Sequence, residues 1–239
     1  MVARSRPCDG RGAPFPPLDR AIADFLVDDP ATSGFRAHAQ TTNPSRALSR
    51  MSTPVSVVAL GTSLTETGGW LEPLGTVMAE RWGRPVMVLN FGKSGANSSW
   101  GVGQIERIIA TCPDVVLIEF SVNDASWFKG VSLRQSRRNT EEIVARLLGA
   151  LPLTTIYLMT MNPVYGLRRW IRPRLKAYYD LYGELAKGLG VGHIDNRPAW
   201  NRLTRPQLTI AIPDGLHPIP EMTVQLVVPT IARAIANLD

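Results

Sequence analysis

The sequence has only two cysteines and three histidines among its 239 residues, and no apolar run approaches the roughly 20 residues that cross a bilayer. Two cysteines are too few for a disulfide scaffold, and no Cys/His spacing indicates a zinc site, so we expect no metal. The chain does not begin with a basic segment followed by an apolar one, as a signal peptide would. These absences predict a soluble, cytoplasmic protein without a membrane span.

Basic residues outnumber acidic ones, and the formal net charge is +6. The densest basic cluster surrounds Trp170 and consists of Arg168, Arg169, Arg172, Arg174 and Lys176. Such a cluster is usually a solvated helix face and loop, and the alternative is a rim that attracts an anionic substrate. No nucleic-acid-binding motif accompanies the charge, so we expect no nucleic-acid partner.

Residues 1–50 differ in composition from the rest of the chain. They are rich in proline, arginine and small polar residues, and only a short helix over Leu18–Val27 is predicted. We therefore interpret residues 1–50 as a flexible or partly helical N-terminal extension and residues 51–239 as the folded domain. Met51 directly precedes a strong strand, which raises the hypothesis that it is the natural start. The intact mass of the natively expressed protein tests this hypothesis.

From Val55 onward, apolar runs rich in β-branched residues alternate with segments of helical periodicity. The runs predict strands at Val55–Leu60, Pro85–Leu89, Val115–Phe120, Thr155–Met159 and, more weakly, Val191–Ile194. Helices are predicted at Leu71–Arg81, Gly103–Ala110, Ser136–Leu148, Leu175–Leu189 and Glu221–Leu238. Because strands that are apolar throughout suit burial on both faces, the alternation predicts a three-layer α/β/α fold with a doubly wound parallel sheet.

Three side chains suited to serine hydrolysis lie next to predicted strand or helix ends. Ser63 follows the first strand, and Asp214 and His217 lie on a glycine-containing turn before the last helix. In this arrangement the carboxylate orients the imidazole, which takes the proton of the hydroxyl. Each residue alone has a simpler interpretation, with Ser63 as a helix N-cap and Asp214 as part of a surface turn. The order of these segments along the predicted sheet favours the catalytic interpretation.

Two further loops at the same predicted edge carry candidate donors for an oxyanion. Gly95 lies in a loop rich in Gly, Ser and Asn, where a glycine lets a ligand approach the backbone N–H closely. Asn123 follows the third strand and could present its amide to a developing negative charge. The alternatives are a plain turn glycine and an asparagine that closes a turn with Asp124.

Over roughly residues 55–237 the chain resembles the SGNH hydrolases, also called the GDSL esterase/lipase family. Ser63 in Gly-Thr-Ser-Leu matches the first block of the family, Gly95 and Asn123 match the next two, and Asp214 and His217 match the last. The resemblance implies a nucleophilic Ser63, an orienting Asp214 and a general base at His217. It also implies an oxyanion hole formed by Ser63, Gly95 and Asn123.

The same resemblance implies a five-stranded parallel sheet in a flavodoxin-like order, and hydrolysis of esters or thioesters without a cofactor. Two departures from the family pattern alter the surroundings of the site and hence the substrate range. Thr62 replaces the usual Asp of the first block, and Ser121-Val122 replaces the frequent Gly-Gly before Asn123. Acyl transfer to an alcohol, and a non-catalytic binding module, remain alternatives. A nucleotide- or flavin-binding protein is a further alternative, although the loops lack a phosphate-binding sequence motif.

Aromatic residues follow the segments that carry the predicted site. We predict that Trp70, Trp100, Trp127 and Trp170 line the substrate site, because aromatics stack on sugar rings or hold a small acyl group. The alternative is ordinary packing of loops. No long apolar lid is recognisable, so the predicted substrate is a short-chain acyl ester, such as an acetyl ester, of a small molecule or saccharide. The oligomeric state is not predicted.

Overall fold

The computed structural model of the protein describes residues 53–236. The predicted extension at residues 1–50 and the hypothesis about Met51 lie outside the described residues.

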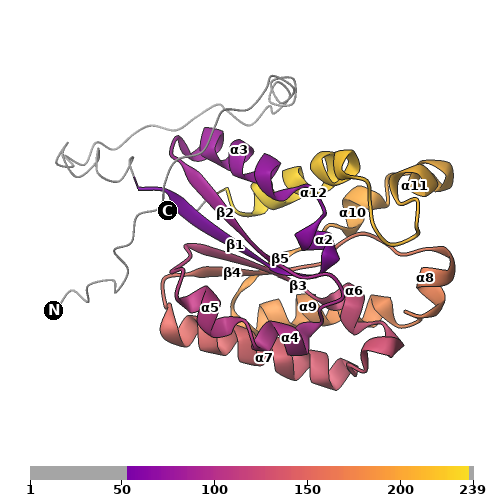
Figure 1. The fold of residues 1–239 in the computed structure, drawn as a ribbon, viewed down its shortest axis with the longest axis horizontal. Helices are drawn as coiled ribbons and strands as arrows, with labels where there is room; N and C mark the ends of the chain where they lie inside the picture. Colours follow the sequence, from indigo (N-terminus) through magenta and orange to yellow (C-terminus); the bar gives the residue numbers. More distant parts are fainter. Residues whose placement is uncertain (1–52, 237–239) are drawn as a thin grey trace. The chain divides into compact units, whose positions relative to one another are not determined.

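One parallel sheet forms the centre of the described domain (Figure 1). Its strands are β1 (Val55–Gly61), β2 (Val86–Gly92), β3 (Val115–Glu119), β4 (Thr155–Met159) and β5 (Gly192–Ile194). They lie in the order β2-β1-β3-β4-β5 and all neighbouring pairs are parallel, which confirms the predicted sheet and its flavodoxin-like order. The direction in which strands are added reverses at β1. β2 pairs with one edge of β1, and the chain then crosses back so that β3 pairs with the other edge.

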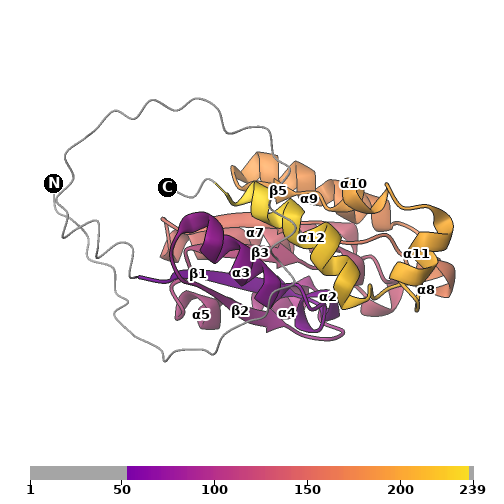
Figure 2. The ribbon, with the colours of Figure 1, turned by 90° about the horizontal axis from the view of Figure 1, so that it is seen from above.

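Helices cover both faces of the sheet. One face carries α3 (Leu71–Trp82) and α12 (Pro220–Ala234), and Figure 2 looks onto this face. The other face carries α4 (Ser98–Val102), α5 (Ile105–Ile109), α7 (Leu133–Ala150) and α9 (Leu175–Leu189). The shorter helices are α2 (Ser63–Glu66), α6 (Ser121–Asp124), the 3-10 helix η2 (Trp127–Lys129), α8 (Gly166–Trp170), α10 (Arg197–Trp200) and α11 (Arg205–Ala211).

Two hydrophobic clusters, one on each face, hold these layers together. Side chains of β1 alternate between them, with Val57 and Ala59 in the cluster under α3 and α12, and Val58 and Leu60 in the cluster under α5, α7 and α9. All four residues are at most 1% exposed, so β1 is buried on both sides. This double burial explains why the first strand is apolar apart from Ser56.

The predicted helix Gly103–Ala110 corresponds to α5, which is shorter at both ends. The short helix α4 before it was not predicted, and a tight turn in which the Gly103 N–H donates to the Trp100 carbonyl joins the two. The predicted helix Glu221–Leu238 begins at Pro220 and ends earlier than predicted, at Ala234, with Ile235 as its C-cap. No helix in residues 53–236 has the length and apolar character needed to cross a membrane.

Candidate active site

Ser63 is the first residue of α2, directly after β1. Thr62 is the N-cap of this helix, and its hydroxyl accepts the Leu64 N–H at 3.2 Å. The capping role that the sequence left open for Ser63 therefore belongs to Thr62. The Ser63 hydroxyl stands at a helix start on the carboxyl edge of the sheet, where it contacts a residue from the far end of the chain.

That residue is His217. Its Nε2 lies 2.9 Å from Ser63 Oγ, and its Nδ1 lies 2.7 Å from Asp214 Oδ2. Since Nδ1 faces a carboxylate, it carries the proton and donates, while Nε2 accepts the hydroxyl proton of Ser63. The structure thus brings together the three side chains that the sequence predicted to form a catalytic group.

The turn that carries Asp214 and His217 is held by several hydrogen bonds. Asp214 Oδ1 accepts the N–H groups of Leu216 and His217 at 2.9 and 2.7 Å. Partial burial alone would raise the pKa of Asp214, but these bonds and that of the His217 ring outweigh it and lower the pKa to about 2. Asp214 is therefore ionised at neutral pH and orients the imidazole. Gly215 has φ = 78°, a conformation that glycine adopts without strain.

The predicted oxyanion donors lie in the loops after β2 and β3. Gly95 has φ = 75°, and neither its backbone N–H nor that of Ser63 has an acceptor among residues 53–236. Asn123 Nδ2 donates one hydrogen to the Ala96 carbonyl at 2.7 Å, which leaves the second N–H of the amide for another acceptor. The bond from Asn123 to Ala96 also ties the loop after β3 to the loop that carries Gly95.

A second set of contacts fixes the Gly95 loop against α2. Glu66 Oε2 accepts the Ser94 N–H at 2.6 Å and also the Ser94 hydroxyl. Asn90 Nδ2 donates to the Glu66 carbonyl at 3.1 Å. Because Glu66 lies one turn after Ser63, these bonds join α2 to the loop with the second predicted donor.

Glu119 is a site residue that the sequence analysis missed. It lies at the end of β3, 1% exposed, and its Oε1 accepts the Thr62 N–H at 2.6 Å, the Thr62 hydroxyl at 2.9 Å and the Thr65 hydroxyl at 2.8 Å. Burial raises the pKa of Glu119 to about 7, although its hydrogen bonds act in the opposite direction. A Cβ on Gly61 would lie 2.3 Å from Oε1, so the carboxyl needs a glycine at that position.

Glu119 therefore holds the residues on both sides of Ser63, namely Thr62 and Thr65. The signal that could have revealed it is a carboxylate inside an otherwise apolar strand, since such a group must find donors when buried. Thr62 is also the position at which the sequence departs from the usual Asp of the family block.

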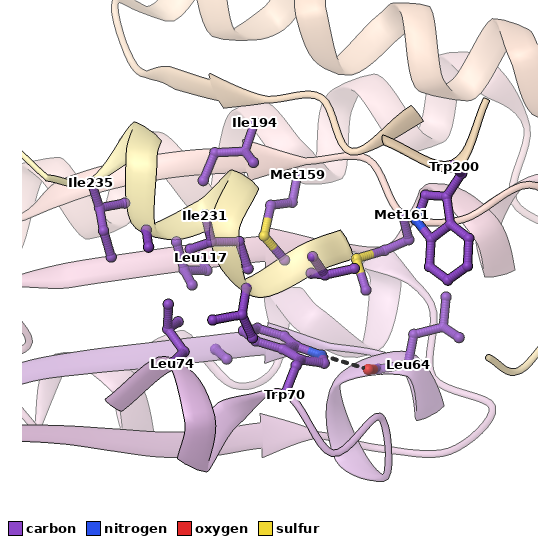
Figure 3. Close-up of a cluster of buried hydrophobic side chains, with 14 of the residues drawn as sticks. Leu64, Trp70, Leu74, Leu117, Met159, Met161, Ile194, Trp200, Ile231 and Ile235 are labelled. Carbon is purple, nitrogen blue, oxygen red and sulfur yellow. Dashed lines mark hydrogen bonds between the residues drawn. The ribbon is translucent and has the colours of Figure 1, made fainter. Parts of the chain in front are cut away.

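The four predicted substrate-binding tryptophans differ in their surroundings. Trp70 is fully buried in the core and donates its Nε1–H to the Leu64 carbonyl at 2.8 Å (Figure 3). The prediction that Trp70 lines the substrate site is therefore wrong, because its ring packs beneath α2. Trp100 is half-buried and packs edge-on against Phe120. Trp127 and Trp170 are exposed by 64% and 76%, and their role stays a prediction.

A small cavity of about 20 Å³ lies beside Ser63 and His217. Its other lining residues come from α2 and the segment after it, from the loop after β4, and from the start of α12 and the residues just before it: Leu64, Thr67, Gly68, Met161, Asn162, Pro218 and Thr223. Asn162 is fully buried and its amide donates to the Leu216 carbonyl at 2.8 Å, so it also holds the turn with His217.

No group of three or more His, Cys, Asp or Glu residues in the described part of the chain is arranged to hold a metal ion.

The fold and the site define an α/β protein with the geometry of a serine hydrolase. Residues 59–222 match the GDSL-like Lipase/Acylhydrolase family. The chain belongs to this family, which confirms the resemblance found in the sequence. A GDSL esterase/lipase of Arabidopsis thaliana is 30% identical over 125 residues, or 45% of this chain. The match spans 50% of that curated relative, so the chain covers about half of its length.

Solved structures share the fold. A lipase/acylhydrolase from Enterococcus faecalis aligns with a TM-score of 0.64 and 24% identity over 76% of this chain and 95% of that chain. An acetylxylan esterase from Geobacillus stearothermophilus aligns with a TM-score of 0.64 and 19% identity over 79% and 97% of the two chains. An α/β hydrolase from the metagenome of Lake Arreo gives a TM-score of 0.67 and 20% identity over 77% and 96%.

Proposed function

We propose that the protein is a serine esterase that hydrolyses short-chain acyl esters, acetyl esters above all, through an acyl-enzyme intermediate. The observation that carries the proposal is the 2.9 Å contact between Ser63 Oγ and His217 Nε2, extended to the Asp214 carboxylate at 2.7 Å. A hydroxyl, an imidazole and an ionised carboxylate in this order form the arrangement that activates serine as a nucleophile.

In the first half-reaction Ser63 Oγ bonds to the ester carbonyl carbon, and His217 Nε2 takes the hydroxyl proton. The imidazolium is stabilised by Asp214, which stays ionised. His217 then returns the proton to the oxygen of the leaving alcohol as the carbon–oxygen bond of the ester breaks. In the second half-reaction water gives a proton to His217 and attacks the acyl carbonyl, which releases the carboxylic acid and restores Ser63 Oγ–H.

The negative charge of each tetrahedral intermediate needs donors that are in place beforehand. The backbone N–H groups of Ser63 and Gly95 and the second amide N–H of Asn123 are the proposed donors. Two observations support this assignment. Neither backbone N–H has an acceptor among the described residues, and the Asn123 amide is held in place by its hydrogen bond to the Ala96 carbonyl. One such donor contributes about 3–4 kcal/mol to transition-state stabilisation.

The size of the small cavity beside Ser63 supports a short acyl group. A volume of about 20 Å³ has room for one group of about the size of a water molecule or a methyl. Its walls include the buried side chains of Leu64 and Met161, which belong to the packed core and resist displacement. An acetyl methyl fits this space, and a longer acyl chain has to extend beyond it.

A saccharide is the proposed alcohol portion of the ester. The exposed rings of Trp127 and Trp170 support it, because aromatic faces in water suit stacking on sugar rings. Acetylxylan esterases are among the proteins of this fold, and we carry that substrate class to this chain only as a proposal.

The test is hydrolysis of p-nitrophenyl acetate by the wild type and by Ser63→Ala. We expect kcat to fall by about 10⁴-fold or more in Ser63→Ala, because the nucleophile is lost. Thr76→Ala, which removes an exposed hydroxyl on α3, is the control and keeps wild-type activity. Circular dichroism confirms that both variants are folded. Wild-type turnover in Ser63→Ala would refute the proposal.

A further inference from the structure

A second, larger cavity of about 240 Å³ opens among the loop after β4, α9 and α10. Four basic side chains line it and no acidic one does: Arg169, Arg172, Lys176 and Arg197. The remaining walls are mostly apolar or aromatic, and consist of Pro163, Val164, Pro173, Leu175, Tyr179 and Asn201. Three of the four cations belong to the basic cluster seen in the sequence.

Nearby carboxylates neutralise only two of the four cations. Arg197 bonds to Asp195 at 2.8 Å and to Asp180 at 3.0 Å, and Lys176 bonds to Asp180 at 2.6 Å. Arg169 forms no ion pair with any residue in 53–236, and neither does Arg172. The cavity therefore has an excess of two positive charges in its walls.

Arg172 is the more informative of the two unpaired cations. Its side chain is buried, with the residue only 4% exposed, and it donates to neutral oxygens alone. Nε bonds to the Val122 carbonyl at 2.8 Å, and one terminal nitrogen bonds to the Arg168 carbonyl at 3.2 Å. The solvated-face interpretation of the basic cluster is therefore wrong for Arg172. A buried guanidinium without a carboxylate is costly, and burial lowers its pKa, as does the nearby Arg168.

The other terminal nitrogen of Arg172 lies 3.5 Å from Asn123 Oδ1. A guanidinium has five N–H groups, and these three contacts leave two of them for a further acceptor. Arg172 thus links the cavity to the amide that we propose as an oxyanion donor. A group bound to Arg172 in this cavity would be one side chain away from Asn123.

We propose that the cavity binds an oxyanion group, a carboxylate or phosphate, carried by the alcohol portion of the ester substrate. Guanidinium groups recognise both carboxylate and phosphate through paired N–H donors. Arg169 and Arg172 are the two cations of the cavity that have no ion-pair partner among the described residues. The alcohol portion is the proposed carrier, because the small cavity at Ser63 has room for little more than an acetyl methyl. This inference rests on the proposed esterase function and names the charge of its substrate.

The volume fits such a group. A cavity of about 240 Å³ is smaller than the ~300–1,000 Å³ typical of drug-sized ligands, and it suits one charged ring or a phosphate. An acetylated uronic acid, which bears a carboxylate on the sugar, has the required chemistry and serves as the probe.

The experiment compares kcat/KM for an acetylated uronic acid with kcat/KM for the matching neutral acetylated sugar, at constant ionic strength. Wild type is expected to prefer the charged ester, and Arg169→Gln is expected to lower the preference about tenfold. Arg169→Gln is expected to leave hydrolysis of neutral p-nitrophenyl acetate unchanged, because the Arg169 side chain forms no hydrogen bond or ion pair with Ser63, His217 or Asp214. Arg138→Gln, an exposed arginine on α7, is the matched control and leaves the preference unchanged.

Inorganic phosphate separates a substrate group from a free anionic ligand. Calorimetry of phosphate binding to wild type and Arg169→Gln measures the cavity directly. Equal kcat/KM for the two sugars in wild type would overturn the inference, even if phosphate binds, since the anion would then be a free ligand. An unchanged preference in Arg169→Gln would overturn it as well. Failure to hydrolyse any neutral ester would contradict the proposed function instead, and phosphate binding that depends on Arg169 would still support the anion site.

Discussion

Glu119 gives a prediction whose size can be worked out from the structure. Its carboxyl is fully buried, and its pKa is raised by burial from an ordinary value of 4.5 to about 7. Glu119→Gln keeps an oxygen where Oε1 accepts from Thr62 and Thr65, but it removes the titrating proton. The substitution therefore separates the hydrogen-bonding role of the side chain from its charge.

The direction in which stability changes with pH follows from proton binding to Glu119. Between pH 4.5 and about 7 the folded protein keeps the Glu119 proton while the unfolded chain loses it. The free energy of unfolding therefore falls as the pH rises through this window, and above it the buried carboxylate costs about 3 kcal/mol. Glu119→Gln has no such proton, so its stability relative to wild type should rise between pH 4.5 and pH 8 by about 3 kcal/mol.

The assay is urea unfolding of wild type and Glu119→Gln at several pH values from 4.5 to 8.5. Glu80→Gln, which changes an exposed carboxylate on α3, is the matched control and should follow wild type at every pH. If the stability difference between wild type and Glu119→Gln is the same at pH 5 and pH 8, the reasoning about the buried carboxyl is refuted.

Three further predictions concern the reaction itself. Asp214→Asn should lower kcat by about 10³–10⁴-fold, because an amide favours the wrong tautomer of His217; an activity above a tenth of wild type would contradict this orienting role. Asn123→Ala should lower kcat by about 10²–10³-fold with little change in KM, and an effect on KM alone would argue against an oxyanion donor. In a panel of p-nitrophenyl esters, kcat/KM should fall about tenfold or more from acetyl to butyryl, and equal values would rule out the small cavity as the acyl site.

The sheet could be predicted from the sequence because its strands are marked by local pattern. Val55 and Val115 begin runs that are apolar except for Ser56 and Glu119, and the structure confirms strands there that are buried on both faces. The short helix α4 and its junction with α5 could not be predicted in the same way. Their junction at Gly103 depends on how the segment packs below Phe120, where a Cβ on Gly101 would lie 2.5 Å from the ring.

The proximity of Ser63 and His217 was predicted from topology rather than from local sequence. The two residues are 154 positions apart, and only the rule that parallel strands share a carboxyl edge brings their loops together. The structure has this contact, while the catalytic roles of the residues stay predictions.

Trp70 and Glu119 show what local pattern leaves out. Trp70 follows the first site segment and is aromatic, as a substrate-binding residue would be, yet its indole is buried against Leu64. Glu119 lies in an apolar run, and its donors come from Thr62 and Thr65, more than 50 residues away in sequence. Such partners are set by the tertiary fold, so composition and spacing do not reveal them.

The most direct test of an activated Ser63 is covalent labelling by a fluorophosphonate, followed by mass spectrometry of the peptides. An activated Ser63 should carry a single adduct in wild type, the adduct should be absent in Ser63→Ala, and labelling should be strongly slowed in His217→Ala. Wild-type protein that stays unlabelled, or that is labelled only at another residue, would contradict the claim that Ser63 and His217 act together.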